Sequence, residues 1–401
     1  MKAVGMMFAA TVLSTSALAQ VTGFVQFRQA QRLDSSDCQA VSACSTMVQE
    51  ALGELLLEKR LNDHWSGSLR VEAGYDNAVS DDRLLVREAF VDWAPTSTAS
   101  VKLGRQVLTW GVSDYLYVND IFPKNYDSFF TGGGFDRMKV PVDAARFQWH
   151  AGAVDVEAVG GRSKADTAPD VRRFSAMTMP SMAVAVDEDD RADLALKVSG
   201  HTGGWDLAGY AASFRSREQR QFMDGSGLRV DRPRLRHLGA SATGNAAGGL
   251  LWLEGAIRDA GDERPLTVNR HFLGSSAKLI AGYSREIGTD LTASAQLQLE
   301  AATSRQRYLD SLAPGLRPLK PVSSTVHLRV HGSWMNQTLN GGAQVFLGNE
   351  GDSHFNPFVS WSPADGWTVE GGANLFNGRS DTRYGAFQDD SNVYVLGRYS
   401  F

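Results

Sequence analysis

The chain has 401 residues, a formal net charge of −5 and 43% hydrophobic residues. A chain of this length normally predicts two or three soluble domains, yet no linker and no shift in composition marks a boundary. Beyond the N-terminal segment, no stretch approaches the roughly 18 apolar residues of a helical membrane span, which excludes such spans. The charge by itself decides nothing about partners.

The first residues have the pattern of an export signal. Lys2 opens a short positive region, Ala3 to Leu13 form an apolar stretch, and Ala17 to Ala19 supply a small-residue cleavage site. The apolar stretch is too short to cross a bilayer. We therefore expect residues 1–19 to be a removable signal peptide and residues 20–401 to form one domain.

Two cysteines, Cys38 and Cys44, follow in the first predicted loop. An exported chain meets an oxidising compartment, so we expect a local disulfide that staples an exposed loop. The alternative is a metal or redox site. Neither Cys-x-x-Cys nor the haem-attachment signature Cys-x-x-Cys-His occurs, and no cofactor is expected.

Apolar and polar residues alternate with a period of two over segments of about ten residues, as in membrane-spanning β-strands. The segment that begins at Leu291 is the clearest, with apolar residues at 291, 293, 295, 297 and 299. Short turns are predicted at 62–63, 94–97, 151–152, 203–204, 245–248, 287–290, 336–337 and 363–366. Long polar loops alternate with them, at 33–49, 76–83, 111–141, 161–190, 216–230, 260–272, 303–320 and 378–390.

This asymmetry is typical of a transmembrane antiparallel up-and-down β-barrel, with short periplasmic turns and long extracellular loops. Counting hairpins predicts about 18 strands, or 16 if Phe355 to Trp361, which contains Pro357, is not a strand. Seven tryptophans flank the predicted short turns, as an interfacial aromatic girdle would: Trp65, Trp93, Trp149, Trp205, Trp334, Trp361 and Trp367.

One motif carries a family resemblance. The segment Leu103 to Gly111 reads LGRQVLTWG, and the preceding predicted strand, Arg87 to Asp92, reads REAFVD. Gly-Arg-Gln at a strand end, followed by Trp-Gly, resembles the porin-like family that includes the alginate-export barrels and their uncharacterised relatives. The resemblance covers residues 50–150 and implies a barrel in the bacterial outer membrane. It permits export with a periplasmic partner, but the residues that bind the polyanion in alginate export find no match here.

Loop 111–141 is rich in aromatic residues that need a surface to pack against. Folding inward against the barrel wall would bury them and leave four charged residues along the pore: Asp114, Asp120, Lys124 and Asp127. The alternative is an extracellular cap packed on neighbouring loops. Three glycines, 132–134, would give the chain the freedom to leave the lumen.

Charges of both signs lie on the strands beside this loop: Glu88, Asp92, Lys102 and Arg105. An arginine or lysine that faces lipid at the membrane midplane costs roughly 2–4 kcal/mol, so all four should face the lumen. Strict alternation sends Arg105 outward, and we therefore expect a bulge at Gly104. Their role is either transport or a structural salt-bridge network.

A basic track is predicted where Arg232, Arg234 and Arg236 repeat along one strand face. Inside a pore, such residues would concentrate anions and pass them from one guanidinium to the next. The alternative is binding of lipopolysaccharide phosphates near the outer rim, since the track flanks a predicted extracellular loop.

The last strand places Val393, Val395, Gly397, Tyr399 and Phe401 on one face. A half-apolar strand that ends on an aromatic residue resembles the closing strand of outer-membrane barrels. In those proteins the terminal aromatic belongs to the signal that the barrel-assembly machinery recognises, and we assign this role to Tyr399 and Phe401.

Catalysis is not expected. His327 and His331 share a strand face but stand about 13 Å apart, too far to share a metal, and no Gly-x-Ser-x-Gly or His-Glu-x-x-His motif occurs. Three functions compete: a passive channel for small hydrophilic, anionic solutes; an export conduit; and a barrel enzyme or adhesin. The partners expected are outer-membrane lipid, lipopolysaccharide and the assembly machinery, and not nucleic acid.

Overall fold

The computed structural model describes residues 20–36, 38, 41–175, 184–187, 191–224, 227–261 and 266–401. The predicted signal peptide, residues 1–19, lies outside the described residues. Within them, no helix is long and apolar enough to cross a membrane.

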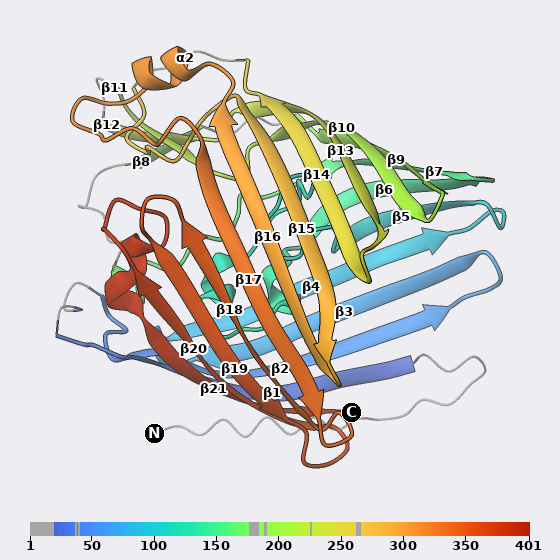
Figure 1. Ribbon diagram of the computed structural model, residues 1–401. Coiled ribbons are helices and arrows are strands. Elements are labelled where there is room, and N and C mark those ends of the chain that lie inside the picture. Colours follow the sequence, from blue (N-terminus) through green and yellow to red (C-terminus); the bar gives the residue numbers. More distant parts are fainter. Residues whose placement is uncertain are drawn as a thin grey trace.

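The described chain is dominated by long β-strands that stand side by side in a ring (Figure 1). The ring strands are β1 (Gln20–Arg32), β2 (Thr46–Arg60), β3 (Trp65–Asp76), β4 (Asp81–Trp93), β5 (Ala99–Gln106), β6 (Val142–Ala151), β7 (Val154–Arg162), β9 (Asp193–Thr202), β10 (Trp205–Arg215), β13 (Arg234–Ala246), β14 (Gly249–Asp259), β15 (Ser276–Gly288), β16 (Leu291–Ala302), β17 (Ser323–Trp334), β18 (Leu339–Gly348), β19 (Ser353–Trp361), β20 (Trp367–Asn377) and β21 (Asn392–Ser400).

These strands form one 18-stranded antiparallel sheet within the described residues. The sheet closes because β1 pairs with β2 on one edge and with β21 on the other, so neither terminal strand leaves an unpaired edge. A second, three-stranded sheet lies over the end that carries the long loops and contains β8 (Val184–Asp187), β11 (Arg220–Asp224) and β12 (Gly227–Asp231). The helical turns are α1 (Tyr126–Phe129), η1 (Asp136–Met138), α2 (Arg305–Asp310) and η3 (Gly385–Asp390).

The predicted barrel and its larger strand count are confirmed, and the doubtful segment around Pro357 is β19. Pro357 lies opposite Ala343 in the pairing with β18, while the pairing with β20 is interrupted between Phe355 and Phe358. Proline has no N–H to donate to a ladder, so the strand keeps its place by pairing fully on one side.

The predicted difference between the two ends of the barrel is also confirmed. Strands at one end are joined by tight turns whose residues adopt a positive φ, among them Gly203 and Gly204 between β9 and β10, and Ala247 and Gly248 between β13 and β14. At the other end the connections are long, as between β5 and β6 and between β16 and β17.

Side chains are distributed in the reverse of a soluble protein. On β1, Gln26, Arg28 and Arg32 are buried inside the barrel, whereas Val25 and Phe27 on the opposite face are 54% and 47% exposed. The other strands repeat this alternation, and their exposed side chains are largely apolar. An outward apolar band with a polar interior is what a bilayer requires of a barrel.

The tryptophans support the same interpretation. Trp65 and Trp93 face each other across β3 and β4 with ring centroids 5.7 Å apart, and Trp334, Trp361 and Trp367 are exposed at the same, short-turn end. Tryptophan collects at a membrane–water interface because its ring is apolar while its N–H is polar.

The C-terminal residue takes part in closing the ring. The Gly23 N–H donates to the Phe401 carbonyl, and the Phe401 N–H donates to the Gly23 carbonyl, both at 2.9 Å. A Cβ on Gly23 would lie 3.0 Å from the Phe401 ring, so the ring packs over a residue without a side chain.

We therefore expect deletion of Phe401 to reduce barrel assembly. The deletion removes two backbone hydrogen bonds, worth about 2 kcal/mol together, and the aromatic group of the proposed assembly signal. The heat-modifiable band of the outer-membrane fraction measures the folded barrel, and Phe401→Tyr is the matched control. Wild-type protein recovered as a folded monomer in the soluble periplasm would contradict the interpretation of the chain as an outer-membrane barrel.

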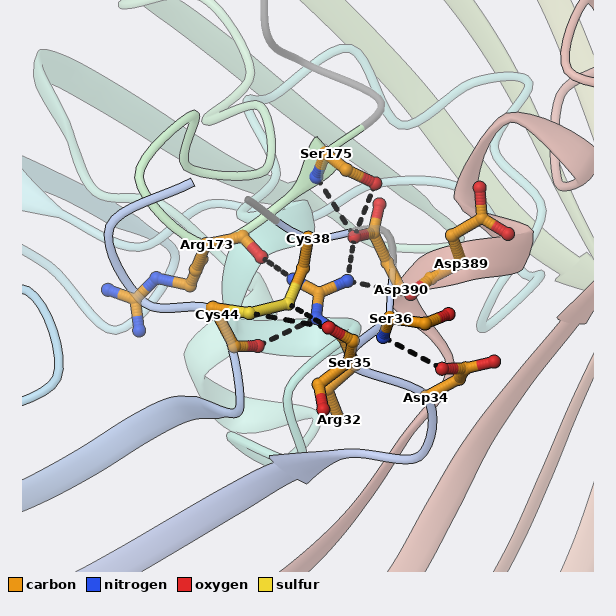
Figure 2. The surroundings of a disulfide bond; sticks show 10 residues. All are labelled: Arg32, Asp34, Ser35, Ser36, Cys38, Cys44, Arg173, Ser175, Asp389 and Asp390. Carbon is orange, nitrogen blue, oxygen red and sulfur yellow. Dashed lines mark hydrogen bonds and ion pairs between the residues drawn. A yellow bond between two sulfur atoms is a disulfide. The ribbon is translucent and has the colours of Figure 1, made fainter. Parts of the chain in front are cut away.

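The predicted disulfide joins Cys38 to Cys44. Figure 2 shows it beside Arg32, whose guanidinium donates to the Cys44 carbonyl at 2.8 Å, donates to the Arg173 carbonyl and pairs with the Asp390 carboxylate. The Ala43 N–H also donates to the Arg172 carbonyl at 2.9 Å. The loop is thus held to its neighbours by contacts that do not involve sulfur.

For this reason we expect Cys38→Ser to assemble normally. A closed loop of about 7 residues restricts the unfolded chain by only about 2 kcal/mol, and the Arg32 contacts remain. Heat-modifiability of the variant is the measurement. A variant that failed to reach the outer membrane would show that the disulfide is needed for assembly.

Candidate functional site

The long connection between β5 and β6 contains loop 111–141, which lies inside the ring of strands (Figure 1). Its residues bind inward-facing side chains of strands far from β5 around the barrel, including Glu254 of β14 and Asn392 of β21. A connection that leaves β5 and reaches both of these strands must cross the interior. Loop 111–141 therefore narrows the lumen.

The first anchor is the Glu254 carboxylate. It accepts hydrogen bonds from the backbone N–H groups of Val112, Ser113 and Asn119 at 2.7, 2.8 and 3.1 Å, and from the Asn119 side-chain amide at 2.9 Å. Gly111 makes this approach possible: its φ is +81°, and a Cβ there would lie 2.9 Å from the carboxylate. Hydrogen bonds to an ionised acceptor are the strong ones.

The second anchor is a row of aromatic rings on the inner wall. His327, Phe346, His354 and Phe376 are direct cross-strand partners on β17, β18, β19 and β20. Successive rings are nearly parallel, with centroids 4.3, 5.6 and 4.5 Å apart.

Three aromatic residues of the loop pack on this row, with ring centroids between 5.0 and 6.3 Å from those of the wall: Tyr115, Phe129 and Phe130. Tilted and edge-to-face pairs of this kind add to the free energy gained by burying the rings. These three aromatic residues therefore hold loop 111–141 against the inner wall.

A polar ladder runs next to the aromatic row. Side-chain hydrogen bonds link six consecutive strands, β16 to β21, through Gln296, His327, Gln344, Asn356, Asn374 and Asn392. Both ends of the ladder reach the loop, because the Ser113 hydroxyl donates to Gln296 and the Asn392 amide donates to the Phe130 carbonyl at 3.0 Å. Each side chain of the ladder forms a hydrogen bond with the next one, so the ladder is held in place on the wall. The two hydrogen bonds at its ends therefore fix the position of the loop along the wall.

The glycines at 132–134 do more than loosen the chain. Gly132 has a φ of +72°, and a Cβ there would lie 2.2 Å from the Tyr394 ring of β21; a Cβ on Gly133 would lie 1.9 Å from the Ser128 hydroxyl. The two glycines are therefore required for close packing, a role that the sequence analysis did not predict.

The third anchor is an ionic cluster at the end of the loop. Arg137 of η1 reaches Glu50 at 3.0 Å and Glu72 at 3.2 Å, on β2 and β3. The same two carboxylates are shared by Arg28, Arg83 and Arg87 at 3.2 to 3.7 Å. Both glutamates are buried. Loss of one partner of a buried ion pair strongly destabilises the folded protein, because the other charge stays buried without a partner.

The four charged residues predicted to line the pore have different surroundings. Asp114 is exposed. Asp120 and Lys124 are buried and pair with each other at 2.8 Å, while Asp127 accepts from the Asp170 N–H at 2.9 Å and lies 3.5 Å from Arg173. The prediction was wrong for Asp120 and Lys124, whose side chains are each only 3% exposed. Asp127 is 18% exposed, and its place along the pore stays a prediction.

Burial also fixes the protonation of loop groups outside the strands. It raises the pKa of Tyr126 and of Tyr117 well above the ordinary value, so both phenols stay neutral. Burial raises the pKa of Asp166 to about 6, even though the Lys124 N–H donates to its carboxylate at 2.8 Å.

The wall charges divide between two faces. Glu88 pairs with Arg70 at 3.2 Å and Asp92 with Lys102 at 3.7 Å, all pointing inward as expected. Arg105 faces outward, like the exposed Leu103 two residues before it, because the register of the described residues shows no shift between β4 and β5 or between β5 and β6. Our expectation of an inward Arg105 is therefore wrong.

Arg105 is accommodated outside by a bidentate pair with Asp143, at 2.8 Å for both contacts, near the end of its strand. The cost of an outward charge falls to about 0–1 kcal/mol close to the interface. Our expectation of a bulge at Gly104 is wrong, since the described pairings of β5 show no register shift. A bulge occurs instead in the pairing of β3 with β4, between Arg70 and Val71, where the extra residue Arg87 points inward to Glu72.

The basic track is also corrected. Arg232 precedes β13, which begins at Arg234 after Pro233. Arg234 and Arg236 alternate with Leu235 and His237, which are buried inside the barrel, so both arginines point outward. Arg234 donates to the Arg191 carbonyl at 2.9 Å. The three residues do not form a ladder along the lumen.

Several residues of the site were missed by the sequence analysis: Glu50, Arg137, Glu254, Gln296, Gln344, Asn356, Asn374 and Asn392. All but Arg137 lie on the polar face of an alternating strand, which is the signal that could have indicated them. Within the described residues, no group of three His, Cys, Asp or Glu side chains could hold a metal ion.

No protein-family model matches the sequence, and the search of curated proteins gives no significant match. Solved structures do match. OccAB4 of Acinetobacter baumannii has a TM-score of 0.60 at 9% identity, over 95% of this chain and 97% of that one. OccK2 (OpdF) of Pseudomonas aeruginosa, solved with glucuronate, has a TM-score of 0.59 at 11% identity, over 96% and 98%.

OccD3 (OpdP) of Pseudomonas aeruginosa gives a TM-score of 0.56 at 10% identity, over 96% of this chain and 91% of that one. At such identities the likeness concerns the fold. It agrees with the closed 18-stranded sheet, the outward apolar band and the tryptophans at one end. The chain is therefore a bacterial outer-membrane β-barrel with the porin fold.

Proposed function

We propose that the protein is a passive channel for small hydrophilic solutes, and that loop 111–141 sets the width of its pore. The observation that carries the proposal is the anchoring of this loop on the inner wall by Glu254, the aromatic row and the Arg137 cluster. A loop fixed at so many points is a permanent constriction. A mobile lid would need surfaces that separate easily.

The charges around the lumen support a channel for polar solutes. Arg70 is 30% exposed beside Glu88, and Lys102 is 23% exposed beside Asp92. On the opposite wall, the Arg329 guanidinium lies 5.6 Å from the Tyr115 ring centroid. These charges are of mixed sign. Any anion preference must therefore come from the constriction, since Arg234 and Arg236 point away from the lumen.

Export of a wide polymer is the second candidate, and loop 111–141 argues against it. Three aromatic side chains and two ion pairs would have to leave the wall before a thick chain could pass. No contact in the described residues favours an adhesin or an enzyme over a channel.

Conductance of the purified barrel in planar bilayers tests the proposal. A steady open-channel current is expected, with a reversal potential in a salt gradient that reports the preferred ion. Glucuronate, which is bound in the OccK2 structure, is a suitable anionic probe for block of that current. A barrel that inserts but carries no current would refute a passive channel.

A further inference from the structure

A shallow groove of about 760 Å³ crosses the outward face of β6, β7, β9, β10 and β13, which stand side by side (Figure 1). Direct cross-strand partners share a face of the sheet, and one row of such partners contains Ala145, Gly160, Leu194, Ser213 and Arg236. Leu194 is 60% exposed, which identifies this row as outward.

The next row towards the periplasm contains Phe147, Ala158, Leu196, Ala211 and Leu238. Phe147, Leu196 and Leu238 are exposed, while the two alanines between them are short. Small side chains between large ones make the outer wall concave here. The groove is lined mostly by apolar groups and opens toward the hydrocarbon of the membrane.

Two arginines stand at the extracellular end of the groove. Arg236 is the last member of the first row and lies near the start of β13, just after a long loop. Arg162 lies on the same face of β7, two residues beyond Gly160. Both are exposed. In the part of the chain that the structure describes, neither guanidinium makes a hydrogen bond or an ion pair.

Neither of the carboxylates that lie directly opposite these arginines forms an ion pair with them, although Asp259 keeps its negative charge beside Arg236. Asp143, opposite Arg162, is held by both arms of Arg105 at 2.8 Å. Asp259, opposite Arg236, accepts from the Ser275 hydroxyl at 3.1 Å and from the Gly261 N–H at 3.3 Å. Two guanidiniums without an ion-pair partner at the extracellular edge of the lipid-facing wall can bind an anion, and arginine binds phosphate in a bidentate manner.

We propose that this groove binds lipopolysaccharide, with an acyl chain running down the groove past Ala158 and Ala211 and the phosphates of lipid A on Arg162 and Arg236. The ligand combines the two features that the surface offers, an apolar tail and a phosphorylated head group. A second copy of this chain fits less well, because a two-fold contact would place concave wall against concave wall and arginine against arginine.

Binding of bis-phosphorylated lipid A to the purified barrel, followed by native mass spectrometry in detergent, tests the proposal. The variant Arg162→Gln with Arg236→Gln should bind at least tenfold more weakly, because a hydrogen bond to a charged group contributes about one factor of ten. The matched control is Arg285→Gln, since Arg285 is exposed on β15 at the opposite, short-turn end. Heat-modifiability verifies that each variant is folded.

A second pair of experiments examines the two parts of the ligand. Dephosphorylated lipid A should bind the wild-type protein as weakly as the double variant binds the intact lipid. Ala158→Leu with Ala211→Leu should fill the groove and weaken binding of both lipids, while conductance stays unchanged.

Lipid A binding that survives both the arginine and the alanine substitutions would overturn the proposal. So would a wild-type oligomer that the alanine substitutions dissociate without any effect on lipid binding, because the groove would then be a contact between copies of the chain.

Discussion

Removing residues 115–130 should raise the single-channel conductance severalfold and blunt ion selectivity. The deletion takes away the aromatic side chains that pack on the inner wall, including Phe130, whose ring centroid lies 5.0 Å from that of Phe376. It leaves the pairing of all 18 ring strands intact, since no described ring strand contains these residues. The lumen then widens by the part of its cross-section that residues 115–130 fill.

The matched control is a deletion of similar kind in another long connection, residues 306–316, which contain most of α2 (Arg305–Asp310) and lie at the extracellular end. This control should leave conductance near the wild-type value. Planar-bilayer recordings of both variants, with folding verified by heat-modifiability, provide the measurement. Equal conductance of the 115–130 deletion and the wild type would show that another part of the barrel limits the current.

The fold was predictable from the sequence because a bilayer imposes simple rules. A backbone in lipid must satisfy its own hydrogen bonds, so strands must close into a ring, and their outward side chains must be apolar. The alternation from Leu291 to Leu299 follows these rules, because each apolar residue faces lipid and each polar residue faces the lumen. Loop length at each end followed from the same pattern.

The errors have two local causes. Arg105 was placed inward on the assumption that an outward charge meets the membrane midplane, whereas it lies near a strand end and pairs with Asp143 at 2.8 Å. The track Arg232 to Arg236 was treated as one strand, but Pro233 separates Arg232 from the start of β13, and the face of the remaining two depends on the inward Leu235 and His237.

The contacts of the site could not have been predicted from sequence patterns. Loop 111–141 binds Glu254, which is more than a hundred residues away, and no local periodicity relates the two. The sequence showed that the aromatic residues of the loop need a partner surface. Only the register of β17 to β20, which aligns His327, Phe346, His354 and Phe376, shows what that surface is.

The most damaging single substitution in the constriction should be Glu254→Ala. Four donors of loop 111–141 converge on this carboxylate, and hydrogen bonds to a charged group contribute about 1.5–3 kcal/mol each. The alanine leaves the N–H groups of Val112, Ser113 and Asn119 without their acceptor. We expect the start of the loop to detach, while the Arg137 cluster still holds its end.

The expected readout is a noisy, fluctuating current of higher mean conductance, together with faster proteolysis within loop 111–141. Glu254→Gln should fall between the alanine variant and the wild type, because the amide keeps one carbonyl acceptor and turns a donor toward the backbone N–H groups. The control is Glu286→Gln, an exposed residue at the short-turn end of β15. If Glu254→Ala kept a quiet current of wild-type size, the aromatic row and the ionic cluster would suffice to hold the loop, and the Glu254 carboxylate would be no more than a satisfied buried group.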